Sequence, residues 1–179
     1  AVVEVKYEDE QVRVANAVGE TFNFDRVVIA TPTTCLDNFL DEAQFADDLN
    51  LLKQFKFEEG ELVIHTDSSV MPPRRKDWCV LSHMMDRKFT RQHFSVWLNS
   101  IEPTLVGKNP VFQTWRPVTE IDPKKIISNV KLTRAVVDLK TLALNKELQQ
   151  RHKDANRKVF YCGSWSCDGL PILESAVTS

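Results

Sequence analysis

Two segments near opposite ends of the chain combine residue types that suit an anionic or electron-rich ligand. Residues 27–32 and residues 159–176 share one layout, an apolar run of strand length, a turn that contains Gly or Pro, and a helical pattern. This layout places backbone N–H groups and a helix N-terminus at the carboxyl edge of a parallel sheet, where such ligands bind. The two ends therefore form the leading candidate for a binding site.

Other residues capable of chemistry lack the spacing that a site requires. No G-x-S-x-G nucleophile elbow is present, which leaves a hydrolase triad without support. Neither G-x-G-x-x-G nor a Walker A loop occurs, so the main phosphate cradle for a nucleotide is not on this chain. The histidines and cysteines follow no metal-ligand spacing, and we expect structural histidines and free thiols at His65, His83, His93, His152, Cys35, Cys79, Cys162 and Cys167.

Two further groups have a structural and a functional interpretation. The basic run at residues 74–76 follows two prolines, and such runs are more often solvated loops than anion sites. The four tryptophans either fill the core or line an apolar pocket, and the core is the commoner place for Trp78, Trp97, Trp115 and Trp165.

Composition indicates an ordinary globular chain. It has 179 residues with 23 basic and 25 acidic side chains, a net charge of −2, which gives no electrostatic footprint for nucleic acid or an anionic membrane. Apolar residues make up 42% and charged residues 27%, enough for a real core. No run approaches the roughly 18 apolar residues of a membrane helix and no signal peptide is visible, so we expect a cytoplasmic protein.

The apolar periodicity predicts the elements that position these residues. Residues 2–24 alternate as a small meander, and residues 25–32 follow as a continuous apolar run, typical of a strand buried in a parallel sheet. Helical patterns follow at 33–41, with Thr33 or Thr34 as N-cap, and at 46–55, with Asp47 or Asp48 as N-cap.

The middle of the chain changes to a period of two. Strands are predicted at 61–67, 78–83, 94–100, 111–116 and 126–137, which together indicate a mostly antiparallel sheet. A helix is predicted at 139–152, a second buried strand at 158–163, and a last helix from about residue 171.

Both end motifs resemble a known family. Residues 25–32, DRVVIATP, resemble the strand and A-T-P turn of flavin-containing amine oxidases and their desaturase relatives. Residues 160–179 are similar to that family's C-terminal flavin motif, and the middle resembles the bacterial branch of NAD/FAD-binding amine oxidase-like proteins. The resemblance implies a mixture of α/β and α+β structure. Residues 1–32 and 156–179 would form an incomplete FAD-binding Rossmann-like layer, and residues 33–155 a mostly antiparallel substrate-domain sheet with helices.

The same resemblance implies the cofactor-binding positions. Gly163 would let the chain approach the ribityl-pyrophosphate, and Ser164 stands where the family often has an acid. Backbone at the A-T-P turn would pass close to the cofactor. The E-G-A motif would start a helix whose amides stabilise negative charge at the flavin pyrimidine edge, with a serine replacing its glycine. The positions implied for these two motifs are Ala30, Thr31, Pro32, Glu174, Ser175 and Ala176.

The resemblance also implies a function, an FAD-dependent oxidoreductase that oxidises a C–N or C–C bond of a small molecule by hydride transfer to flavin. Trp97, Phe112 and Trp115 would wall the substrate pocket, and no catalytic residue is assigned. A carotenoid- or squalene-type desaturase fits the end motifs equally well. A non-catalytic binding module is the alternative of another class, since Ser164 and Ser175 replace expected motif residues.

The missing dinucleotide fingerprint leads to a prediction about flavin. The family's N-terminal strand, G-x-G-x-x-G turn and ribose-binding acid are not among these residues, so we expect the chain to be a C-terminal portion of an FAD enzyme. Because most polar contacts to the cofactor would be missing, this chain alone should bind FAD weakly or not at all. An absorbance spectrum of the purified chain tests this, and flavin near one equivalent would contradict it.

Overall fold

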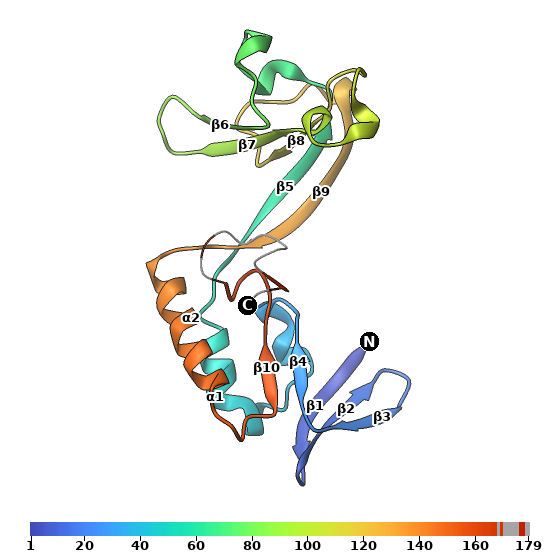
Figure 1. Ribbon diagram of the computed structural model, residues 1–179, viewed down its shortest axis with the longest axis vertical. Helices are drawn as coiled ribbons and strands as arrows, with labels where there is room; N and C mark the ends of the chain where they lie inside the picture. Colours follow the sequence, from blue (N-terminus) through green and yellow to red (C-terminus); the bar gives the residue numbers. More distant parts are fainter. Residues whose placement is uncertain (168, 170–175, 178–179) are drawn as a thin grey trace. The chain divides into compact units, whose positions relative to one another are not determined.

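The structure divides into two compact units. This computed structural model describes residues 1–167, 169 and 176–177 (Figure 1). Unit 1 comprises Ala1–Glu58 and Ala135–Ser179, and unit 2 comprises Glu59–Arg134. The described part of the chain has few helices and mostly antiparallel sheets, which confirms the mixed α and β class expected from the sequence.

The boundaries of the units differ from the domain boundaries expected at 1–32 with 156–179 and at 33–155. Both α-helices described below belong to unit 1, because they pack on the strands contributed by the two ends of the chain. The assignment of one domain to FAD and the other to substrate stays a prediction. Neither α-helix has the length and apolar character that crossing a bilayer requires, within the residues described.

Unit 1 contains a meander, a parallel strand pair and two α-helices. Its elements are β1 (Val2–Glu8), β2 (Gln11–Asn16), β3 (Thr21–Phe24), β4 (Val27–Ile29), η1 (Thr33–Asn38), α1 (Glu42–Leu52), α2 (Leu139–His152) and β10 (Val159–Tyr161). β1, β2 and β3 pair antiparallel, as the alternating pattern predicts. The buried side chains of Val5 and Val12 join this meander to the core of the unit.

The two ends of the chain meet in the parallel pair β4–β10. The backbone N–H of Val27 donates to Lys158 O at 2.8 Å, and that of Cys162 donates to Ile29 O at 3.0 Å. This pairing confirms, for the residues of β4 and β10, the expectation that strands from the two ends of the chain lie in one layer. Because Val27 and Ile29 bond to β10, the N–H and C=O of Val28 face the other edge, where the described residues add no further strand.

α1 begins earlier than the sequence predicts. Its N-cap is Asp41, whose side chain accepts a hydrogen bond from Gln44 N at 3.0 Å. The predicted caps Asp47 and Asp48 therefore lie inside the helix, which corrects that expectation: the helix has already begun, so its first free N–H groups lie at the Asp41 turn.

The helix caps predicted before α1 are absent, whereas the start of α2 has a side-chain cap. Residues 33–38 form the 3₁₀ helix η1, which follows Pro32 and has no side-chain cap, so neither Thr33 nor Thr34 caps it. α2 spans the residues that the sequence predicts. Asp138 and Thr141 form a capping box there, with Thr141 N donating to Asp138 Oδ1 at 2.8 Å.

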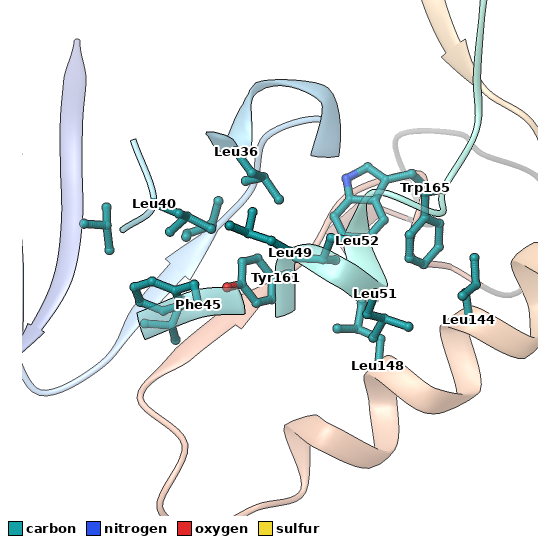
Figure 2. Packing of buried hydrophobic residues seen from close by; sticks show 14 of the residues in the cluster. Leu36, Leu40, Phe45, Leu49, Leu51, Leu52, Leu144, Leu148, Tyr161 and Trp165 are labelled. Atoms are coloured by element: carbon teal, nitrogen blue, oxygen red, sulfur yellow. The ribbon is translucent and has the colours of Figure 1, made fainter. Parts of the chain in front are cut away.

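The core of unit 1 packs both helices against β10 (Figure 2). Leu144 and Leu148 of α2 lie toward Leu51 of α1, and Tyr161 of β10 lies beside Phe45. Each such buried side chain contributes about 1.5–3 kcal/mol through the loss of apolar surface to water. The strand β10 is thus held in place by α1, which precedes unit 2 in the sequence, and by α2, which follows it.

A partly buried polar network ties α1 to β10 and to the end of α2. The Asp48 carboxylate accepts hydrogen bonds from Arg157 Nη2 at 2.5 Å, Tyr161 OH at 2.9 Å and Arg151 Nη1 at 3.4 Å. Asp48 and Arg157 side chains are each only 12% exposed. Burial raises the pKa of Tyr161, and the neighbouring Asp48 carboxylate raises it further, so the phenol stays a donor.

Unit 2 is built on a five-stranded sheet with the order β6-β7-β8-β5-β9. Its elements are β5 (Phe57–His65), η2 (Ser68–Val70), η3 (Arg75–Asp77), β6 (Leu81–Met85), β7 (Gln92–Trp97), η4 (Leu98–Ser100), η5 (Pro103–Leu105), β8 (Phe112–Trp115), η6 (Pro123–Lys125) and β9 (Ile126–Ala135). The β6–β7, β7–β8 and β8–β5 pairs are antiparallel, as predicted. A separate small core forms around Val63, Val70, Met71, Phe112 and Ile121.

Removal of the Asp48 carboxylate should destabilise unit 1. Asp48→Ala leaves Arg157 and Tyr161 without their buried acceptor, and we expect a loss of about 3 kcal/mol in the free energy of unfolding. Asp47→Ala is the matched control, because that neighbouring side chain is exposed and should change stability by less than about 0.5 kcal/mol. Urea denaturation followed by circular dichroism measures both variants, and equal losses would contradict the role of the network.

Candidate functional site

The turns after β4 and β10 lie at one edge of the parallel pair. Parallel strands end on the same side, so the turn at Ala30, Thr31 and Pro32 comes close to the turn at Gly163 and Ser164. The indole Nε1 of Trp165 donates to Thr31 O at 3.1 Å and links the two turns directly. The structure thus brings together five of the predicted cofactor-binding residues, whose role toward FAD stays a prediction.

Gly163 has a backbone conformation and a close contact that a side chain would disturb. Its φ is +152°, and an added Cβ would lie 2.6 Å from Trp165 Nε1. Its carbonyl oxygen accepts from both the N–H and the hydroxyl of Ser166, each at 3.0 Å. The glycine therefore lets Trp165 fold back over the turn and reach Thr31.

Trp165 and Asn145 position these turns, and neither was predicted from the sequence to belong to the binding site. Trp165 is buried and packs edge-on against Phe55, with 4.9 Å between ring centroids. Asn145 of α2 is fully buried, and its Nδ2 donates to Cys167 O at 2.8 Å. Asn145 occupies an unremarkable helical position and Trp165 is one of four tryptophans, so no sequence pattern points to contacts with chain segments 22 and 134 residues away.

An apolar cavity lies beside the β4 turn. It has a volume of about 350 Å³ and is lined by the meander, by β4 and by Phe39, with Ala30 and Thr31 at the turn itself. Thr31 Oγ1 is buried and has no hydrogen-bond partner among the described residues. Val28, also in the lining, is 63% exposed. The cavity can accommodate an apolar or ring-shaped group.

The remaining predicted cofactor positions lie mostly outside the described residues. Glu174 and Ser175 are not described, so their proposed place at a helix N-terminus stays a prediction. Ala176 is described, in a helical turn with Val177, and is partly buried.

The predicted pocket residues all lie in unit 2, on neighbouring strands. Trp97 and Phe112 are opposite each other across β7 and β8, and Trp115 is opposite Phe94. Phe112 is 0% exposed and belongs to the core of the unit, while Trp115 is 8% exposed. Phe112 and Trp115 are three residues apart on one strand and so point to opposite faces of the sheet. Trp97 lines a cavity of unit 2. Their role as a substrate wall stays a prediction.

A chain of buried polar side chains crosses the sheet of unit 2. His65 Nε2 lies 2.8 Å from Thr114 Oγ1, which lies 2.7 Å from Ser95 Oγ. Asp67 N donates to His65 Nδ1 at 3.1 Å, so the ring proton is on Nε2 and points to Thr114. Burial lowers the pKa of His65 and keeps the ring neutral.

The carboxylate of Asp67 is engaged away from that histidine. It accepts from Asp122 N at 3.0 Å, Ser69 N at 3.1 Å and Lys125 Nζ at 3.1 Å. Burial raises the pKa of Asp67, but these hydrogen bonds outweigh it and lower the pKa to about 2. The group therefore anchors the connection before β9 rather than orienting a catalytic histidine, and His65 has the structural role that the sequence predicts.

Comparisons with known proteins show the fold. No family model matches the chain, and no curated protein does. Among solved structures, the chain is similar to reduced UDP-galactopyranose mutase, with a TM-score of 0.54 and 9% identity over 93% of this chain. It is also similar to a CLA-producing fatty acid isomerase from P. acnes, with a TM-score of 0.53 and 10% identity over 90% of this chain.

These similarities show a fold that the chain shares with parts of those two proteins, and they do not indicate an amine oxidase specifically. The chain covers 41% of the length of each of the two structures. The fold class expected from the sequence, a mixture of α and β structure with a largely antiparallel sheet, is therefore confirmed.

A side chain at Gly163 should loosen the turn that carries the site. Gly163→Ala imposes backbone strain and also a clash with Trp165, whereas Gly19→Ala, at a φ of +86° with open space around it, imposes strain alone. We expect Gly163→Ala to lower stability by about 1–3 kcal/mol more than Gly19→Ala. Thermal unfolding followed by Trp fluorescence measures the stability of both variants. Equal losses would show that the close approach of Gly163 and Trp165 does not affect stability.

Proposed function

We propose that the turns after β4 and β10 form one edge of an FAD site, in an amine oxidase-like flavoenzyme that oxidises a C–N or C–C bond. The observation that carries the proposal is the parallel pairing of β4 and β10, with Trp165 joining their turns at Thr31. This is the edge of a parallel sheet at which ligands of α/β folds bind. The flavoprotein-type fold supports the cofactor, and the two end motifs support the reaction class.

The described residues fit one part of the cofactor. A glycine allows close backbone approach at residue 163, and the unpaired hydroxyl of Thr31 can serve a polar atom of a bound group. The cavity beside them is lined by apolar side chains and by no charged one. These features suit an apolar ring and a hydroxyl-bearing chain, and the lining residues of the cavity include no charged group for the phosphates.

When bound, FAD supplies the hydride acceptor, and the protein supplies position and electrostatics. In this proposal the backbone of Ala30, Thr31 and Pro32 and that of Gly163 contact the cofactor edge, with Ser164 as a neutral hydrogen-bonding group. The sheet of unit 2 supplies the substrate side, where aromatic residues such as Trp97 exclude water.

The reaction class in this proposal does not follow from the fold, because the two solved structures of similar fold catalyse different reactions. One neighbour is a mutase of UDP-galactopyranose and the other a fatty acid isomerase, so the fold alone leaves the reaction open. The choice of an amine oxidase-like reaction rests on the residues of the two end motifs. The cytoplasmic location expected from the sequence belongs to the same proposal.

Thr31 offers a test that separates a cofactor contact from a structural one. Since its hydroxyl is buried without a partner, Thr31→Val should leave the stability of this chain unchanged or slightly raised. In the natural gene product that contains these residues, the same change should weaken FAD binding about 2- to 12-fold, the value of one hydrogen bond. Thr21→Val, on the exposed strand β3, is the matched control and should leave FAD binding unchanged.

Flavin absorbance of the same gene product reads out the reaction class. A protein of the proposed function takes up one equivalent of FAD, and anaerobic addition of its substrate bleaches the oxidised flavin. Amines and unsaturated isoprenoids, tested separately, distinguish an amine oxidase from a desaturase. A gene product that contains no flavin and takes up none would overturn the proposal in favour of a non-catalytic binding module.

A further inference from the structure

A second cavity lies wholly within unit 2, apart from the β4–β10 edge. Its volume is about 480 Å³, within the range of small-molecule sites. Arg75 of η3 and Lys108 of the loop after η5 bring two positive charges to it, beside the indole of Trp97. The basic run that the sequence presents as a loop therefore contributes one residue to a concave surface.

The guanidinium of Arg75 is held against two indoles that are anchored to the core. It lies 5.0 Å from the ring centroid of Trp78 and 5.6 Å from that of Trp97. Trp78 is fixed by a hydrogen bond from its Nε1 to Pro72 O at 2.8 Å, and it packs on the fully buried Phe112 at 5.4 Å. These cation–π contacts favour one placement of a charged side chain that would otherwise sample many rotamers.

The contacts with the two rings leave the hydrogen-bonding capacity of the guanidinium unused. A guanidinium is attracted to an aromatic face through its positive charge, and its N–H groups match carboxylate and phosphate oxygens. In the described part of the chain, no carboxylate pairs with Arg75 or Lys108. The nearby acids in sequence are engaged elsewhere, since Asp77 pairs with Arg74 at 2.7 Å and Glu102 accepts from Thr104 N at 3.1 Å.

The loop that carries Lys108 is ordered around one amide side chain. Asn99 Nδ2 donates to Asn109 O at 3.1 Å, and its Oδ1 accepts from Val111 N at 2.7 Å. Gly107 has a φ of +74°, which gives the loop its tight turn. Because these hydrogen bonds already exist in the free protein, ligand binding would cost little conformational entropy in the loop.

We infer that this cavity binds an anionic group, a phosphate or a carboxylate, between Arg75 and Lys108. Both cations can form charge-assisted hydrogen bonds to the same anion, and Asn99 keeps the lysine loop in place. The buried indole N–H of Trp97 has no acceptor among the described residues, and an oxygen of the ligand would supply one. The inference is argued from the geometry of this cavity and does not rest on bound FAD, although Trp97 is also assigned to the substrate side in the proposed function.

Titration of the purified chain tests the site directly. Inorganic phosphate and acetate are added separately at constant ionic strength, and the indole N–H signals of the four tryptophans are followed by NMR. We expect saturable shifts at Trp78 and Trp97, with Trp115 and Trp165 unmoved as internal references. A larger effect of phosphate assigns a phosphate ligand, and a larger effect of acetate assigns a carboxylate. The absence of saturable shifts with either anion would overturn the inference.

Charge-neutralising variants give the matched comparison. Arg75→Gln should weaken binding at least about tenfold, because it removes one charge-assisted hydrogen-bonding group. Lys76→Gln makes the same change in net charge at the next residue, which does not line the cavity, and should weaken binding less than about twofold. Arg75→Lys keeps the charge and loses the planar fork, so it should fall between them. Equal weakening by Arg75→Gln and Lys76→Gln would show unspecific attraction and overturn the inference.

Discussion

The parallel ladder between β4 and β10 is the contact on which the rest of unit 1 depends. Each strand has three residues, and they come from positions about 130 residues apart, so the ladder alone cannot offset the loss of chain entropy. It persists because α1 and α2 cover Tyr161 and because Trp165 extends the connection to Thr31. The turns that make up the candidate site are therefore in place only when both helices are packed.

The Asp48 network gives this packing its specificity. A leucine in place of Asp48 would bury more apolar surface, but it would remove the acceptor of Arg157 Nη2 and of the Tyr161 hydroxyl. The network thus allows one register between α1, β10 and the end of α2. Unit 2 follows the same logic on a smaller scale, since Asp67 is satisfied by three donors and anchors the segment that leads into β9.

Local patterns predicted much of the secondary structure, and tertiary contacts account for what they missed. The alternation in residues 2–24, the apolar runs around β4 and β10, and the pattern of α2 each correspond to observed elements. The sequence offers Asp47 or Asp48 as a helix cap, because the partner of Asp48, Arg157, lies 109 residues away and a sequence shows no such pairing. The bounds of the two compact units also differ from those of the predicted domains, because the sequence does not show which strands the helices pack on. α1 and α2 are amphipathic helices whose partners only the fold reveals, and Arg75 looks like a loop residue until Trp78 and Trp97 are seen beneath it.

No strand among the described residues pairs with the outer side of β4, and this has a consequence for the behaviour of the chain on its own. A bare strand edge that carries an exposed valine is a template on which copies of a protein stack into fibrils. Here the template is three residues long, follows a charged Asp-Arg pair and stops before a proline, which has no N–H to donate. These three features disfavour pairing of β4 with the β4 strand of another copy of the chain.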